Sequence, residues 1–277
     1  MKRILCLLAL LHPISGYGQT NPATIGPAKG TLIIVGGGAK SAPIFKRFIE
    51  IAGGADAPIV IIPTAEEQDP ADLDHCPSVR SLRNAGATNL SFINTRDRST
   101  ADSEAFIAPL LNAKGVWLGG GRQWRLADAY LNTKTQKALF DVLARGGVIG
   151  GSSAGATIQG SFMVRGDPSG NTIMVSPTHT EGFALLKNSA IDQHVITRKR
   201  QNDMVPVIKD RPQLLGIGLD EDTAIVVQGD QCEVIGASKA LFYDAAKWPP
   251  RDSHWWTELS AGQRYDLKQR KPLDPAK

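Results

Sequence analysis

A serine bracketed by small residues is the strongest sign of chemistry in this 277-residue chain. It is Ser153, in the run Gly151-Ser152-Ser153-Ala154-Gly155, which follows the apolar residues Val148 and Ile149. Gly-x-Ser-x-Gly between a buried strand and a helix is the spacing of a nucleophile elbow, a strained turn that projects the serine hydroxyl beyond the strand. The same small residues also suit a turn that only packs a helix on a strand, so both interpretations stay open.

A serine nucleophile needs a base, and His194 is the best candidate. It follows Ile191-Asp192-Gln193, the end of a short predicted strand, and precedes Arg198 and Arg200. Histidine is the usual base for a serine hydroxyl. A basic run alone is usually a solvated surface, but guanidinium groups beside a catalytic base can hold a substrate carboxylate through paired hydrogen bonds.

Two glycine-rich loops follow predicted strands. Gly36-Gly37-Gly38 has neither the spacing of a P-loop nor the third glycine of a dinucleotide-binding fingerprint, which argues against nucleotide binding. The second loop runs from Gly119 to Gln123 and offers the backbone amides of Gly120 and Gly121 to a developing oxyanion. Removing one such donor typically costs about 3 kcal/mol of transition-state stabilisation. A plain strand-to-helix turn is the structural alternative.

The elements that must position these residues alternate along the chain. Continuous apolar runs predict buried strands, and helical spacing between them predicts a doubly wound, mostly parallel α/β sheet with helices on both faces. The predicted strands are 31–35, 58–62, 89–93, 115–118 and 147–149, and helices are predicted at 43–52 and 77–85. In such sheets ligands bind at the carboxyl ends of the strands, where the serine turn and both glycine loops lie.

The later part of the chain has a different pattern. Strand alternation from Gly216 to Tyr243, with a turn at Gly229-Asp230, predicts an antiparallel hairpin at the sheet edge. The tail from Ala245 predicts a partly extended, surface-packed segment that becomes disordered, with its tryptophans as core plugs. No composition shift marks a boundary, so residues 19–277 are expected to form a single domain.

The first 18 residues have the pattern of a cleavable signal peptide: Lys2 and Arg3, a short apolar core and small residues Gly16 and Gly18. Their removal lowers the basic count from 31 to 29 against 27 acidic residues, which leaves a net charge of about +2 and no nucleic-acid signature. No later apolar run is long enough to span a membrane. The mature protein is therefore expected to be secreted or periplasmic and not membrane-bound.

Two cysteines remain outside the signal segment, Cys76 and Cys232. Neither has metal-ligand spacing around it, so no metal site is predicted. The oxidising compartment permits a disulfide between them, and two unpaired buried thiols fit as well.

Seven ordered blocks that cover almost all of the mature chain resemble peptidase family S51, the family of the cyanophycinases. They are Ile34–Gly38, Ala52-Gly53-Gly54, Ile61–Ala65, Gly120–Gln123, Gly151–Ala156, Ile191–His194 and Gly216–Ala224. Seven blocks in order are far more specific than one pentapeptide.

The resemblance implies a three-layer fold like that of class I glutamine amidotransferases, flavodoxin-like in outline, with Ser153 as nucleophile and His194 as base. It also implies that Gln123, Asp192, Gln193, Arg198 and Arg200 line the substrate site. We expect the amides of Gly120, Gly121 and Ala154 to hold the oxyanion, with no cofactor. Cyanophycinases release β-aspartyl-arginine from cyanophycin, a poly-aspartate that carries arginine on each β-carboxyl group.

The chain also departs from the family pattern. The family's histidine-orienting acid is expected soon after the elbow helix, where no glutamate stands, and Asp167 and Glu181 are the nearby substitutes. A third family arginine falls at about Asp203, and Arg122 stands where the family commonly has aspartate.

These differences leave three functions open: a secreted cyanophycinase-like serine peptidase, an aspartyl or isoaspartyl dipeptidase of the same family, and a catalytically silent binding protein. An α/β-hydrolase esterase fits less well, because only 41 residues separate Ser153 from His194. The expected partner is a peptide or polypeptide substrate. The sequence leaves a homodimer open.

Overall fold

A central sheet carries the predicted parallel strands. The computed structural model describes residues 24–38, 42–248 and 254–273. Within them a nine-stranded sheet has the order β14-β13-β10-β9-β1-β5-β4-β2-β3. Its parallel half consists of β1 (Thr31–Val35), β5 (Val148–Ser152), β4 (Gly115–Leu118), β2 (Ile59–Ile62) and β3 (Leu90–Phe92). All five strands predicted from apolar runs are confirmed, with β5 shifted toward the serine.

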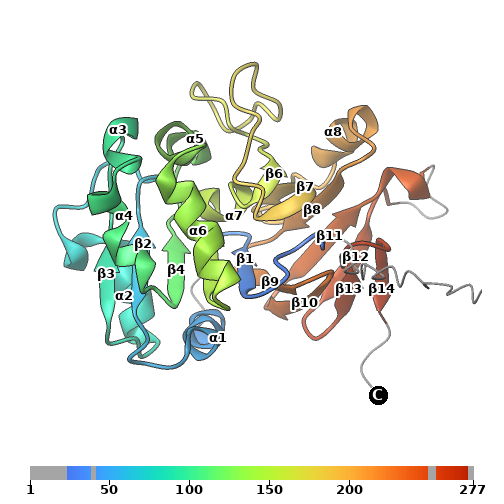
Figure 1. The fold of residues 1–277 in the computed structure, drawn as a ribbon. Coiled ribbons are helices and arrows are strands. Elements are labelled where there is room, and N and C mark those ends of the chain that lie inside the picture. Colours follow the sequence, from blue (N-terminus) through green and yellow to red (C-terminus); the bar gives the residue numbers. More distant parts are fainter. Residues whose placement is uncertain (1–23, 39–41, 249–253, 274–277) are drawn as a thin grey trace, which may run out of the picture.

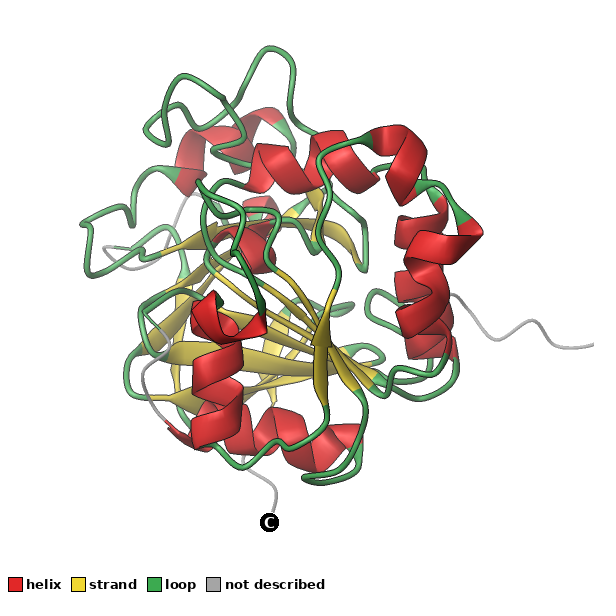
Figure 2. Cartoon of the chain, turned by 90° about the vertical axis from the view of Figure 1, so that its left-hand side faces the viewer, coloured by secondary structure: helices red, strands yellow, loops and turns green. Residues whose placement is uncertain are grey.

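Helices cover both faces of the parallel half (Figures 1 and 2). On one face α1 (Ala42–Ala52) and α2 (Pro77–Asn84) pack against Ile33 and Val35 of β1. On the other face Leu32 and Ile34 meet the layer of α4 (Glu104–Leu111), α5 (Gln123–Tyr130) and α6 (Lys134–Ala144). Alternate residues of one strand thus enter two cores, which is why the strand is apolar throughout. The short α3 (Arg98–Ala101) precedes α4. The α/β fold class is confirmed.

A second sheet, which the sequence pattern did not predict, packs beside this core. Its order is β12-β11-β8-β7-β6, with β6 (Gly160–Phe162), β7 (Leu186–Gln193) and β8 (Leu215–Leu219) parallel to one another. The helix α7 (Ala154–Thr157) leads from β5 into it, and α8 (Met204–Asp210) covers its outer face. The carboxyl ends of β7 and β8 therefore lie at one edge.

The prediction of one hairpin from Gly216 to Tyr243 is corrected. Only β9 (Thr223–Gln228) and β10 (Gln231–Gly236) form a hairpin, around the predicted turn at Gly229, and they join the central sheet beside β1. The flanking β8 and β11 (Lys239–Tyr243) belong to the second sheet. Strand alternation is the same in both sheets, so periodicity could not separate them.

The described part of the tail is more ordered than expected. It supplies β12 (Thr257–Ser260) to the second sheet and β13 (Arg264–Asp266) and β14 (Lys271–Leu273) to the central sheet. Two short 3-10 helices, η1 (Leu73–His75) and η2 (Ala245–Lys247), complete the elements. The tryptophans Trp248, Trp255 and Trp256 pack, partly buried, against the core under α8.

Cys76 and Cys232 are both buried and unpaired, in different hydrophobic clusters. The predicted signal segment lies outside the described residues. Within the described ranges, no helix has the length and apolar character needed to cross a membrane.

Candidate active site

Ser153 occupies a strained turn between β5 and α7. Its backbone has φ 55° and ψ −109°, a conformation that a non-glycine residue adopts only when the surrounding structure enforces it. The two glycines of the motif permit the turn because a Cβ on Gly151 would lie 2.3 Å from the Gly155 oxygen, and one on Gly155 would lie 2.2 Å from the Leu118 oxygen. The Gly-x-Ser-x-Gly spacing is thus required by close packing, and it leaves the Ser153 side chain free to meet a base.

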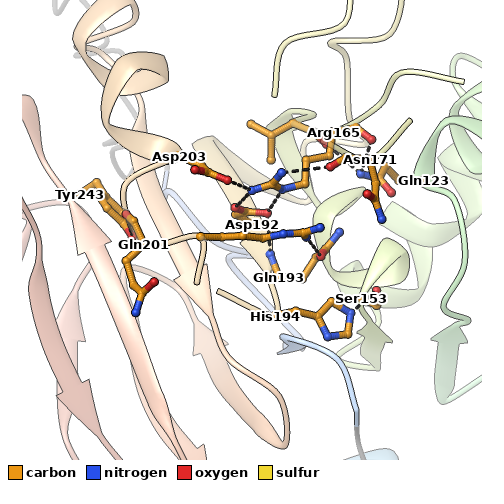
Figure 3. A network of polar contacts seen from close by, with 12 residues as sticks. Gln123, Ser153, Arg165, Asn171, Asp192, Gln193, His194, Gln201, Asp203 and Tyr243 are labelled. Carbon is orange, nitrogen blue, oxygen red and sulfur yellow. Dashed lines mark hydrogen bonds and ion pairs between the residues drawn. The ribbon is translucent and has the colours of Figure 1, made fainter. Parts of the chain in front are cut away.

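A chain of hydrogen bonds runs from a carboxylate through His194 to Ser153. The Ser153 Oγ lies 2.9 Å from His194 Nε2, and His194 Nδ1 lies 2.7 Å from Glu221 Oε1. Figure 3 shows the His194 ring facing Ser153. This is the geometry of a serine–histidine–acid triad, in which the acid orients the imidazole and the far nitrogen removes the serine proton.

The carboxyl end of β1 holds all three members in place. Three successive carbonyl groups, those of residues 35–37, accept hydrogen bonds from the backbone N–H groups of Ser153 (3.0 Å), His194 (2.9 Å) and Asp222 (2.8 Å). Asp222 directly follows Glu221. Residues 35–37 therefore fix the backbone at Ser153 and at His194. They also fix the backbone at Asp222, the residue next to Glu221.

The glycine loop after β1 is explained by the same contacts. Gly37 has φ 123°, and a Cβ there would lie 2.2 Å from His194 Cε1. A Cβ on Gly38 would lie 2.6 Å from Glu221 Oε2. Glycines are required in this loop, which resembled a phosphate-binding turn, because the His194 imidazole and the Glu221 carboxylate pack directly against its backbone.

Burial lowers the pKa of His194. The hydrogen bond to Glu221 acts in the opposite direction, while the positive charges of Arg198 and Arg200 lower the pKa further. The net direction is downward, which keeps the imidazole neutral near pH 7. A neutral imidazole can accept the proton of Ser153.

The two acids proposed from the sequence lie elsewhere. Asp167 accepts hydrogen bonds from Ser169 and Ser176 in the loop between β6 and β7, and the Ser169 bonds lower its pKa. Glu181 lines a separate pocket beside α5. Glu221 takes the position at His194 instead. The sequence did hold a signal for it: Glu221 lies within the last of the seven blocks, two residues after β8 ends at the edge shared with β7.

Two of the three predicted oxyanion donors lie beside the serine. Ala154 opens α7 directly after Ser153, so its N–H belongs to the helix start, where amides lack intrahelical partners. Gly120 is close enough that a Cβ there would lie 3.8 Å from the Ser153 Cβ. Gly121, with φ 131°, packs instead against the Ala65 carbonyl.

The predicted substrate-site residues split into buried and accessible groups. Gln123 is buried and donates from Nε2 to the carbonyls of Val164 and Arg165, so it anchors the loop after β6. Asp192 is fully buried, and both of its oxygens accept from Arg165. Both side chains are therefore buried and already bonded to groups of the protein.

Arg198 is exposed and Arg200 is half-buried, and both lie close enough to the triad for their charges to act on His194. Arg200 Nη1 lies 3.3 Å from the Gln193 Oε1, and the Arg198 guanidinium has no hydrogen-bond or ion-pair partner among the residues the structure describes. Both lower the pKa of His194 through their charge. A substrate carboxylate near the triad would find these groups available.

The other departures from the family pattern have structural partners. Asp203 Oδ2 lies 2.7 Å from Arg165 Nη2, and Arg122 donates to the Asp167 carbonyl.

The described ranges contain no group of three or more His, Cys, Asp or Glu residues placed to hold a metal ion.

Comparison with known proteins identifies a family that this chain resembles over most of its length. Residues 32–235 match the model of peptidase family S51. A cyanophycinase of Geminocystis herdmanii is 30% identical over 78% of this chain and 81% of its own length. A cyanophycinase of Trichormus variabilis is 32% identical over 77% of this chain and 74% of its own length.

A solved structure has a similar fold. The crystal structure of a peptidase from an acI-B1 actinobacterium superposes with a TM-score of 0.68 and covers 87% of this chain and 98% of that one, at 24% identity. This likeness concerns the fold alone.

Proposed function

Because the chain belongs to peptidase family S51 and is a serine-type peptidase, we propose that it hydrolyses aspartyl peptide bonds through an acyl-enzyme on Ser153. The observation that carries the proposal is the unbroken hydrogen-bond chain Glu221–His194–Ser153, at 2.7 and 2.9 Å. Such a chain has no evident use in packing, because it ends on a partly exposed hydroxyl in a strained turn.

In the proposed mechanism His194 Nε2 takes the proton from the Ser153 Oγ as that oxygen attacks the carbonyl carbon. The negative charge moves to the carbonyl oxygen, where the amides of Ala154 and the Gly120-Gly121 loop would stabilise it. Protonated His194 then donates its proton to the leaving nitrogen. Water, deprotonated by the same imidazole, hydrolyses the ester.

Glu221 would stabilise the imidazolium that forms in both half-reactions. Its carboxylate is one-third exposed and close to the Gly38 backbone, so it is held in place without being fully desolvated. The presence of this acid favours an enzyme over the catalytically silent binding protein, the alternative that rested on a missing glutamate.

We propose two substrates within the aspartyl class. Cyanophycin is proposed first, since the two relatives described above carry the name cyanophycinase. Short aspartyl or isoaspartyl peptides are the second candidate, because Arg198 and Arg200 leave positive charge for a free carboxylate beside the triad. Export through cleavage of residues 1–18 is part of the proposal, and sequencing the amino terminus of the mature protein tests it.

The experiment has two parts. Insoluble cyanophycin and α- and β-aspartyl peptides are incubated with the protein, and the products are identified by mass. A fluorophosphonate probe then reports the activated serine without any substrate. The proposal is supported if Ser153→Ala and His194→Ala are not labelled while Ser152→Ala still is. Hydrolysis by Ser153→Ala at the wild-type rate would refute the assignment of Ser153 as nucleophile.

A further inference from the structure

All three nitrogens of the Arg165 guanidinium donate hydrogen bonds within the protein. Its side chain is 1% exposed. Nε and Nη2 donate to the two oxygens of Asp192 at 2.7 and 2.9 Å, Nη2 also donates to Asp203 at 2.7 Å, and Nη1 donates to the Asn171 carbonyl at 3.0 Å. Figure 3 shows the guanidinium between the two carboxylates, next to the Gln193 and His194 segment.

The backbone of Arg165 is fixed as well. Its N–H donates to the Met174 carbonyl, its own carbonyl accepts from Gln123, and its φ is 54°. A non-glycine residue in this conformation is held there by its surroundings. The guanidinium is thus part of the folded site.

This arrangement leaves Asp192 inaccessible to a ligand while Arg165 is in place. Its side chain is 1% exposed, both oxygens accept from Arg165, and Oδ1 also accepts from the Gln193 N–H. Bidentate pairing with a guanidinium is among the strongest hydrogen-bonded pairings that a carboxylate makes. The buried acid at the end of β7 is therefore already occupied by an arginine of the chain itself.

We propose that Arg165 is a specificity-determining residue: its guanidinium occupies the space between Asp192 and Asp203, here called the acidic pocket, so that the site does not select for a guanidinium on its substrate. The proposal rests on the proposed aspartyl-peptide hydrolysis and says which part of the substrate the site selects. The site would then recognise its substrate by a substrate carboxylate that Arg198 and Arg200 bind. The residue attached to the aspartyl group would be interchangeable.

The pocket has one side toward solvent, through which a ligand could compete. Asp203 is 41% exposed, whereas Arg165 is 1% exposed. A substrate guanidinium that approached there would meet the Asp203 carboxylate, which is already paired with Arg165. The positive charge of Arg200 is also close by. Burial and the charge of Arg165 both lower the pKa of Arg200. This side is also where a guanidinium could enter if the Arg165 side chain were removed.

The first test needs no change to the pocket. β-Aspartyl-arginine is compared with β-aspartyl-citrulline, which has the same shape and a neutral urea group, by kcat/KM on the wild type and by calorimetric Kd on Ser153→Ala. We expect both ratios to lie within threefold. A preference for arginine of tenfold or more, which one well-formed charged pair would give, overturns the proposal.

These measurements distinguish failure of the proposed function from failure of the proposed role of Arg165. If neither the peptides nor cyanophycin is hydrolysed but both peptides bind Ser153→Ala equally, the proposed function fails and the role of Arg165 stands. If peptides are hydrolysed with a strong arginine preference, the role of Arg165 fails and the function stands. Absence of binding by either peptide overturns the role of Arg165.

The second test opens the pocket. In Arg165→Ala we expect β-aspartyl-arginine to become preferred over β-aspartyl-citrulline by at least tenfold, and millimolar methylguanidinium to raise the melting temperature. Arg165→Lys keeps a cation in the pocket and is the matched control, with no such preference. If Arg165→Ala folds and gains neither property, Arg165 does not exclude guanidinium groups; if it does not fold, the first test decides.

Discussion

The contact between Gly37 and the His194 ring gives a prediction that can be worked through in numbers. A Cβ on Gly37 would lie 2.2 Å from Cε1, 2.6 Å from Nε2 and 2.7 Å from Nδ1 of the imidazole. Ordinary contact begins at 3.4 Å, so the ring in Gly37→Ala must retreat by about 1.2 Å. The Ser153–His194 hydrogen bond, now 2.9 Å, would then be lost.

A misplacement of about 1 Å in a catalytic group typically costs about 10²-fold in rate. We therefore expect Gly37→Ala to react with a fluorophosphonate about 100-fold more slowly than the wild type, equivalent to about 2.7 kcal/mol in the activation barrier. The second-order labelling rate measures this before any substrate is known.

Gly54→Ala is the matched control. Gly54, which follows α1, has φ 107°, close to the 123° of Gly37, but a Cβ there meets nothing within 4 Å. Both variants should lose about 1–3 kcal/mol of stability from backbone strain, so melting temperatures should fall together. Labelling of Gly37→Ala within threefold of Gly54→Ala would refute the reasoning.

Three further predictions concern the triad and its charges. Glu221→Gln should lower the labelling rate about 10²–10⁴-fold, because the imidazole loses the carboxylate that orients it; Glu181→Gln, whose carboxylate has no partner among the described residues, should label like the wild type. The acid limb of kcat/KM against pH should have its midpoint below the ordinary histidine value of 6.5, since burial lowers the pKa of His194 and the neutral form is the active one; a midpoint above 6.5 contradicts this. Arg198→Ala should move that limb upward and raise KM for substrates with a free carboxylate, since the variant removes a charge that opposes protonation of His194; Arg200→Ala should do the same to a smaller extent.

The sequence predicted the parallel half of the fold and two members of the hydrogen-bonded chain. Strands buried on both faces are apolar throughout, so 31–35 and 115–118 were placed to the residue. Ser153 was found because the elbow demands glycines at fixed positions, and such a steric demand is visible in the sequence. His194 was found because it ends a strand beside arginines.

Glu221 was missed for a topological reason. It stands 27 residues after His194, and its place at the site depends on β8 running parallel to β7 in a second sheet. The alternation from Gly216 to Tyr243 predicts one hairpin with its turn at Gly229, which would place Glu221 within the first strand of that hairpin at the sheet edge. Asp203 was likewise noted only as standing where the family has an arginine, because its partner Arg165 lies 38 residues away.

The three carbonyl groups at the end of β1 also determine when the protein can become active as it is made. They join an early strand to residues 153, 194 and 222, and β1 itself lies between β5 and β9 in the sheet. A chain still being synthesised would have the serine turn long before it had the acid, and the hydroxyl would remain unactivated until β9 docked beside β1. Catalytic competence is therefore a late folding event in this architecture, coupled to closure of the sheet.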